Sequence, residues 1–102
     1  MKLKELLKDI KVKQTKGNLE VEIKGISFDS RRAKPGDIFV CIPGTKDDGH
    51  NYASQASKHG AVAFLAKREV EITSQQALVL VEEPRLEMGK LAERLFGEPS
   101  RK

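Results

Sequence analysis

The first hydrophobic residues of the chain follow a helical period. Apolar side chains spaced as i, i+3, i+4 and i+7 predict a short amphipathic helix, and they are Leu3, Leu6, Leu7 and Ile10. A turn signal then separates this helix from segment 19–23, where apolar and charged residues alternate. This alternation predicts a strand with one solvent-exposed side. Gly25 interrupts it, and Ile26 and Phe28 continue it as far as Asp29.

Three uninterrupted apolar runs follow, at residues 38–42, 61–66 and 78–81. The first run is bounded by turn signals, which is typical of a central strand buried on both faces of a sheet, and the other two are predicted to be further buried strands. A tight turn is predicted at 34–37, just before the first run. Its second residue is Pro, which fixes φ, and its third is Gly, which tolerates a positive φ.

Two further helices are predicted between and after these runs. One begins near Asn51, which is a suitable N-cap, and ends at Gly60. The other begins at Pro84 and ends at Gly97, with apolar residues again at helical spacing. Gly89 lies inside this last helix, where it costs about 1 kcal/mol relative to Ala. We therefore expect close packing at that position.

The order of the elements defines a fold class. A strand, a helix and a strand over residues 38–66 predict two parallel strands joined by a crossover. We predict an α/β fold: a single small domain with a central, mostly parallel or mixed sheet of about five strands flanked by helices.

The same order locates a candidate ligand site. Ligands of open α/β sheets bind beyond the carboxyl ends of the strands, so segments 28–32 and 44–52 are expected to meet at one edge of the sheet. Besides backbone amides they offer two hydroxyls and two cations, on Ser30, Thr45, Arg31 and Lys46. Such groups suit a polar ligand that carries phosphate or a nucleobase.

Composition narrows the class of protein. The 102 residues are 38% hydrophobic and 33% charged, which fits one globular domain, and the aromatic content of 5% requires an aliphatic core. Cys41 is the only cysteine and has apolar neighbours, which predicts a buried thiol and a reducing, cytoplasmic location. No apolar run approaches the roughly 18 residues of a membrane span, and the N-terminus lacks a signal-peptide core. No membrane partner is expected.

The net charge of +4, from 19 basic and 15 acidic side chains, leaves two alternatives. Lysines crowd the first segment, at Lys2, Lys4, Lys8, Lys11, Lys13 and Lys16. They indicate either a nucleic-acid footprint or a solvated helix face followed by a charged turn. The second is favoured because no aromatic residues interleave for base stacking, and because Glu5 and Asp9 can each sit one helical turn from a lysine. No nucleic-acid partner is expected.

Known catalytic patterns do not match. Segment 44–49 has the glycine spacing of an ATPase phosphate loop, but His50 and Asn51 follow where that motif requires Lys and Ser or Thr. Two histidines and one cysteine cannot form a zinc site with the ordinary number of ligands unless several carboxylates complete it. A Cys41–His50 nucleophile pair is disfavoured because burial raises the pKa of a thiol. We predict no catalytic and no metal-binding residue, and we expect His50 to order the start of the following helix.

Three charged residues lie in or beside the predicted loops, and two of them have local explanations. Asp29 and Asp37 are expected to fix their loops by local hydrogen bonds rather than to act as an acid–base pair. Arg31 has two interpretations that the sequence leaves open, a surface ion pair or a contact with a ligand.

Several motifs, taken together, resemble a known family. Their order and spacing are specific, although each alone is weak: ISFDSR at 26–31, KPGDIFVCI at 34–42, DGHNY at 48–52 and GAVA at 60–63. The set resembles the N-terminal domain of the Mur ligases. The most similar type is MurE, the UDP-N-acetylmuramoyl-L-alanyl-D-glutamate ligase of peptidoglycan synthesis. Residues 96–100 resemble the link to that family's central ATPase domain.

The resemblance implies a ligand and its contacts. In this family the N-terminal domain holds the UDP end of the nucleotide-sugar substrate. Uridine-contacting positions fall on Phe28 and Ser30 in the first loop, and on Thr45, Lys46 and Asp47 in the second. The full-length enzyme would join meso-diaminopimelate or L-lysine to UDP-MurNAc-L-Ala-D-Glu, using ATP and magnesium and passing through an acyl phosphate.

The resemblance also implies what residues 1–102 lack. The phosphate loop and metal ligands of the central domain, and the C-terminal domain, are absent from this chain. We therefore expect one UDP-sugar-binding domain that has no cofactor of its own and is inactive alone, with those two domains of the same ligase as its partners. The alternatives are a MurF-type ligase adding D-alanyl-D-alanine, or a small basic nucleic-acid-binding module. The 96–100 link and the short 44–49 loop favour the MurE type.

Overall fold

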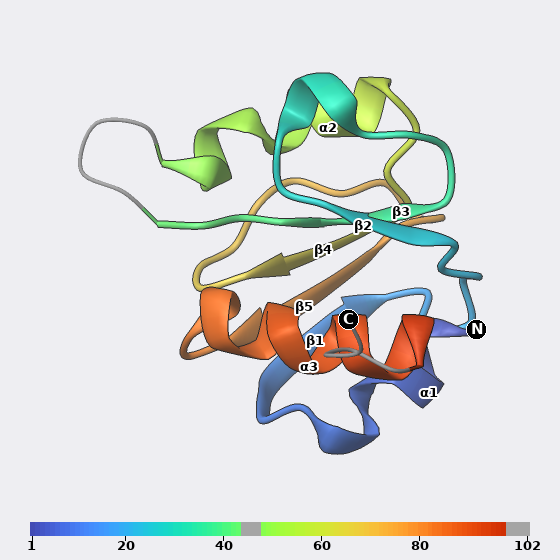
Figure 1. Cartoon of the computed structure of the whole chain (residues 1–102). Helices are drawn as coiled ribbons and strands as arrows, with labels where there is room; N and C mark the ends of the chain where they lie inside the picture. The colour runs from blue at the N-terminus through green and yellow to red at the C-terminus, as the bar shows by residue number, and fades with distance from the viewer. Residues whose placement is uncertain (44–47, 98–102) are drawn as a thin grey trace.

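The computed structural model of this chain describes residues 1–43 and 48–97. Five strands form one sheet in the order β1-β5-β4-β3-β2 (Figure 1). The strands are β1 Val12–Gly17, β2 Gly25–Ser27, β3 Asp37–Val40, β4 Ala63–Ala66 and β5 Ala77–Val81. Strands β2 to β5 are parallel to their neighbours, whereas β1 pairs antiparallel with β5. The predicted α/β fold with a mixed, mostly parallel sheet is confirmed.

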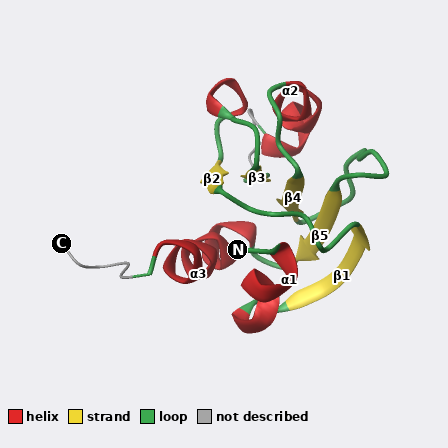
Figure 2. Cartoon of the chain, turned by 90° about the vertical axis from the view of Figure 1, so that its right-hand side faces the viewer, coloured by secondary structure: helices red, strands yellow, loops and turns green. Residues whose placement is uncertain are grey.

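Helices cover both faces of the sheet. The α-helices are α1 Leu3–Leu6, α2 Ala53–Lys58 and α3 Pro84–Phe96, and short 3₁₀ helices are η1 Leu7–Asp9, η2 Ser30–Arg32 and η3 Gly49–Tyr52. Figure 2 shows α1 and α3 on one face and α2 on the other. Within the described residues, no helix has the length and apolar composition that crossing a bilayer requires.

Alternation along the central strands supplies both core layers. In β3, Ile38 and Val40 pack in the layer of α1 and α3, whereas Phe39 packs in the layer of α2. The ring of Phe39 meets that of Phe64 edge to face, with centroids 6.3 Å apart. Every residue of β3, β4 and β5 is buried, and except for Asp37 these residues are the apolar ones expected in buried strands.

The turn before β3 is also confirmed. The Asp37 N–H donates to the Lys34 carbonyl at 3.1 Å, and Gly36 has a φ of 91°. The Asp37 carboxylate accepts a hydrogen bond from the Lys34 N–H at 3.1 Å, so this residue completes the turn as expected.

The predicted strand at 19–23 is wrong. The alternation of exposure is real, since Glu20 and Glu22 are exposed and Ile23 is buried. However, the backbone bonds to the N-terminus rather than to the sheet: the Ile23 N–H donates to the Met1 carbonyl at 2.8 Å, and the Leu3 N–H donates to Val21. Only an isolated bridge joins Lys2 and Glu22. The apolar side of this segment therefore covers the core outside the sheet.

The charged turn expected after the first helix is wrong as well, because β1 occupies residues 12–17. In this strand only Val12 and Thr15 are half-buried, and the register shifts between Val12 and Gln14. That irregularity removes the period-two pattern by which a strand is found in a sequence. Pairing with buried β5 determines this strand.

Close packing at Gly89 is a third incorrect expectation. A Cβ built on this residue would meet no other atom within 4 Å. The glycine therefore lies on an open, exposed part of α3.

Candidate functional site

The carboxyl ends of β2 and β3 bring two segments to one edge of the sheet. These strands run parallel with Ser27 opposite Phe39, so the chain leaves both on the same side (Figure 1). A groove of about 770 Å³ opens there, within the usual range for ligand sites. It is lined by Phe28, Asp29, Ser30, Arg31, Phe39, Ile42, Pro43, Gly49, Tyr52, Gln55, Arg85 and Met88. For the described residues, the predicted meeting of the two loops is confirmed.

Asp29 fixes the first segment by a local hydrogen bond, as expected. Its side chain caps η2, since Oδ1 accepts from the Arg31 N–H at 3.0 Å. The Arg31 side chain folds back, with Nε 3.3 Å from the same oxygen. Hydrogen bonds from Arg31 hold the pKa of Asp29 below its usual value. Arg31 is thus in a surface ion pair and also lines the groove, so the structure is compatible with both interpretations.

Ser30 is the buried polar residue of the groove. It is only 6% exposed, and its Oγ donates to Oε1 of Gln55 at 2.8 Å. Because Gln55 comes from α2, this bond ties the segment after β2 to the helix after β3. Phe28, by contrast, is 66% exposed at the groove rim.

Asp48 and His50 anchor the second segment. Asp48 caps η3 by accepting from the His50 N–H at 2.9 Å, and its Oδ1 lies 2.6 Å from the His50 Nδ1. The other ring nitrogen of His50 accepts from the backbone N–H groups of Lys67 and Arg68 at 3.0 and 3.2 Å. Since Nε2 is an acceptor, the ring proton sits on Nδ1 and points at Asp48. The expected ordering role of His50 is confirmed. Asn51 does not cap α2, whose N-cap is Tyr52 without a side-chain hydrogen bond, and Asp48 caps the preceding η3.

The pKa of Asp48 reflects the hydrogen bonds that this carboxylate accepts. Burial by itself would raise the pKa of Asp48, but hydrogen bonds from the His50 backbone, the Arg68 guanidinium and the His50 ring outweigh it and hold that pKa well below its usual value. Burial raises the pKa of the Cys41 thiol to about 12, with the nearby Asp48 charge adding to the effect. The prediction that Cys41 is not an activated nucleophile is thereby supported.

Gly49 allows the second segment to approach the end of β3. Its N–H donates to the Ile42 carbonyl at 2.8 Å. A Cβ on Gly49 would lie 2.5 Å from the Ile42 nitrogen, which is closer than real Cβ atoms come. The glycine of the DGH motif thus has a steric function at the floor of the groove.

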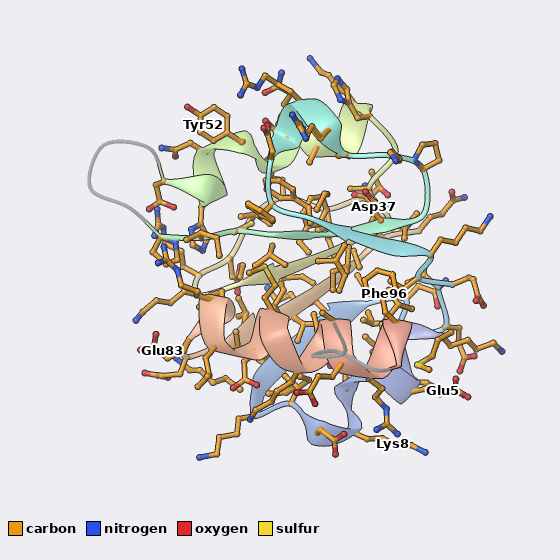
Figure 3. All side chains as sticks on the ribbon, in the orientation of Figure 1. Glu5, Lys8, Asp37, Tyr52, Glu83 and Phe96 are labelled. Atoms are coloured by element: carbon orange, nitrogen blue, oxygen red, sulfur yellow. The ribbon has the colours of Figure 1, made fainter. Side chains whose placement is uncertain are left out.

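Arg85, Met88 and Gln55 line the groove but are not among the predicted site residues. Arg85 and Met88 belong to the first turns of α3, which follows β5. Because β5 is parallel to β4 and β3, its carboxyl end faces the same edge. Ligands of open α/β sheets bind beyond the carboxyl ends of the strands, and this applies to the segment after β5 as it does to those after β2 and β3. Figure 3 shows Tyr52 and Glu83 on opposite sides of the sheet at this edge.

Of the five predicted uridine-contacting residues, Phe28 and Ser30 line the groove. Thr45, Lys46 and Asp47 lie outside the described residues. No group of three or more His, Cys, Asp or Glu side chains in residues 1–43 and 48–97 is placed to hold a metal ion.

The fold is a small α/β domain with a groove beyond the carboxyl ends of its parallel strands. Residues 22–95 match the family described as "Mur ligase family, catalytic domain". This chain belongs to the Mur ligase family, as its motifs predict.

Curated relatives extend the match over the whole chain. The UDP-N-acetylmuramoyl-L-alanyl-D-glutamate–2,6-diaminopimelate ligase of Syntrophomonas wolfei is 45% identical over 99% of this chain and 21% of its own length. The enzyme of the same name from Caldanaerobacter subterraneus is 41% identical over 100% of this chain and 21% of its own length. The chain therefore spans about a fifth of these relatives.

Solved structures agree on the fold. A UDP-N-acetylmuramoylalanyl-D-glutamyl-2,6-diaminopimelate–D-alanyl-D-alanyl ligase from Acinetobacter baumannii superposes with a TM-score of 0.58 and 32% identity, over 67% of this chain and 15% of that one. A UDP-N-acetylmuramoyl-L-alanyl-D-glutamate–2,6-diaminopimelate ligase gives a TM-score of 0.70 over 94% of this chain and 19% of that one. Its identity of 21% supports the fold alone.

Proposed function

We propose that residues 1–102 are the UDP-sugar-binding domain of a MurE-type ligase and hold the UDP end of UDP-MurNAc-L-Ala-D-Glu. The observation that carries this proposal is the groove that joins Phe28, Ser30 and Gln55 at the carboxyl edge of β2 and β3. The names of relatives that match nearly the whole chain support the choice of substrate.

The groove chemistry suits a nucleotide. The exposed ring of Phe28 offers a flat apolar face on which a base can stack. The Ser30 hydroxyl donates to Gln55 and can still accept a hydrogen bond from a ligand, and the Gln55 amide nitrogen beside it supplies donors. Thr45, Lys46 and Asp47 remain predicted contacts.

The ligase reaction is proposed for the parent protein rather than for this chain. That protein would use ATP and magnesium to add meso-diaminopimelate or L-lysine, in the cytoplasm where nucleotide precursors and ATP are available. Its central and C-terminal domains would supply the ATP and amino-acid sites. We expect no ATP-dependent ligation by residues 1–102 alone, and measurable ligation would contradict this part of the proposal.

A MurF-type ligase is the second candidate. Its support is the 32% identity to the D-alanyl-D-alanyl ligase structure from Acinetobacter baumannii, which covers only 67% of this chain. The diaminopimelate ligases match 99% and 100% of the chain at higher identity. We therefore favour the MurE type.

Nucleic-acid binding by the N-terminal lysines is the alternative from another class. Several of these lysines are paired with acidic side chains: Lys2 and Lys4 with Glu20, Lys13 with Glu82, and Lys16 with Glu69. Such pairing leaves less uncommitted charge for phosphate backbones. Nucleic-acid affinity would fall steeply with salt, whereas base stacking and hydrogen bonding to uridine would not, so titrating binding against salt separates the two classes.

Replacing Ser30 by Ala tests the assignment directly. The variant should bind UDP and UDP-MurNAc-dipeptide about fivefold more weakly, because one hydrogen bond to the ligand is worth about 1 kcal/mol. Isothermal titration calorimetry measures the affinity, and circular dichroism checks that the fold is kept. Ser54→Ala is the matched control, since Ser54 is an exposed residue of α2 that does not line the groove. Equal UDP affinity in wild type and Ser30→Ala would show that the site is assigned wrongly.

A further inference from the structure

Two arginines line the groove among the described residues, and they differ in how their charge is used. The Arg31 guanidinium contacts Asp29, with Nε at 3.3 Å from Oδ1 and one terminal nitrogen at 3.4 Å from Oδ2. Arg85 makes no hydrogen bond or ion pair with any residue in 1–43 or 48–97. Its charge is therefore uncommitted within the described part of the chain.

The charge balance of the groove depends on this residue. The ionised side chains among its described lining are Asp29, Arg31 and Arg85. Asp29 and Arg31 neutralise each other as a pair, so the net positive charge of the described lining comes from Arg85. A groove of this kind favours a ligand with negative charge at the Arg85 side.

The position of Arg85 is complementary to that of Ser30. Ser30 lies in η2 in the layer of α2, whereas Arg85 lies in the first turn of α3 on the other face of the sheet (Figure 1). Both nevertheless line the same groove, because it crosses the sheet edge. A ligand lying in this groove extends from a hydroxyl and an amide at one side to a guanidinium at the other.

We propose that Arg85 binds the diphosphate of the nucleotide whose uridine is held at the Phe28 and Ser30 side. This inference rests on the proposed function, since it assigns one part of the same ligand. A guanidinium presents planar, paired N–H donors that match phosphate oxygens, and it stays charged at all relevant pH values. Arg85 thus gives the groove its preference for a nucleoside diphosphate over a nucleoside.

The test compares UDP with uridine, because only UDP carries the diphosphate. Both are titrated into ¹⁵N-labelled chain and followed by amide chemical shifts, which measure weak as well as strong binding. Arg85→Gln should lower the UDP-to-uridine affinity ratio about fivefold and leave uridine affinity unchanged. Arg85→Lys, which keeps the charge but loses the planar donor pair, should give a smaller loss. The control is Arg32→Gln, which removes the same charge from an exposed residue that does not line the groove.

The outcomes separate the two levels of the proposal. If wild type binds uridine and UDP but Arg85→Gln keeps the wild-type ratio, the role of Arg85 is wrong and the proposed function stands. An equal loss in Arg32→Gln would assign the effect to general charge and also overturn the inference. If wild type binds neither compound, the proposed function fails, and the role of Arg85 fails with it.

Discussion

Two aspartates fix the backbone segments that line the groove. Each accepts a hydrogen bond from the backbone N–H two residues later in the chain. Asp29 accepts from the Arg31 N–H at the start of η2, and Asp48 accepts from the His50 N–H at the start of η3. Such contacts are local in sequence, so the DSR and DGH motifs are readable without a structure. Each motif also presents a neighbour to the groove, Ser30 in one case and Gly49 in the other.

The ionised state of Asp48 leads to a pH-dependent stability. A carboxyl whose pKa is lower in the folded state stabilises the fold above its unfolded pKa, and this contribution is lost as the pH falls. The free energy of unfolding should therefore exceed that of Asp48→Asn above about pH 4, and the difference should shrink toward pH 2. Urea unfolding at several pH values, followed by circular dichroism, measures this difference.

A control variant isolates this effect from other carboxylates. Glu71 is exposed and has no ion pair with any described residue, so Glu71→Gln should differ from wild type by nearly the same small amount at every pH. If the difference between wild type and Asp48→Asn were also constant with pH, the hydrogen bonds at Asp48 would not have the energetic effect inferred here.

Some of the residues that line the groove cannot be predicted from local sequence patterns. Ser30 and Phe28 were predicted through the motif that contains them, and both line the groove. Gln55 contacts Ser30 only because two strands place η2 beside α2, a relation between residues 25 positions apart. No local pattern carries that information. Arg85 could be predicted from the rule that ligands bind beyond the carboxyl ends of strands, because it follows a strand that ends at the same edge of the sheet.

Among the helices, α3 contains one destabilising residue, Gly89, that can be replaced. Gly89 is exposed in the helix interior and a Cβ there would meet open space. Gly89→Ala should raise the free energy of unfolding by about 0.5–1 kcal/mol, because Ala has less backbone freedom to lose on folding. Urea unfolding measures the change, and a decrease would show that the glycine has a role in packing that the structure does not reveal.

Gly49→Ala is the informative contrast for the same substitution. Its Cβ would lie 2.5 Å from the Ile42 nitrogen and 3.0 Å from Cys41 backbone atoms. Relieving these contacts requires the segment after β3 to move, so stability should fall by about 1–3 kcal/mol and UDP affinity should fall with it. The free energy of unfolding should therefore rise on replacing Gly89, where helix propensity decides, and fall on replacing Gly49, where steric contacts decide.

The elements that were mispredicted share a physical cause. Buried strands β3, β4 and β5 are continuous apolar runs, and these were found. Strand β1 is a mostly exposed edge strand with a register shift, so its identity depends on pairing with β5 rather than on its own pattern. Segment 19–23 has the right alternation, but residues 1–3 take up backbone hydrogen bonds that a sheet neighbour would otherwise satisfy. The hydrophobic period of a segment indicates which of its sides is buried, but it does not indicate which other segment its backbone hydrogen-bonds with.

At the scale of the whole molecule, the groove is a product of topology. Strands β2, β3 and β5 all end at one edge, and the segment after each contributes to a single lining. The chain corresponds to about a fifth of its curated relatives, with 21% of their length covered.

Titration of UDP into the ¹⁵N-labelled chain, followed by amide chemical shifts, tests whether this groove is the UDP site. We predict shift changes concentrated at residues 28–31, 49–55 and 85–88, which border the groove on both faces of the sheet, and smaller changes with ADP. Residues of β1 and the N-terminal lysines should not respond. An absence of shifts with UDP, or shifts concentrated on the lysine-bearing N-terminal segment instead, would contradict the assignment of this groove as the UDP site.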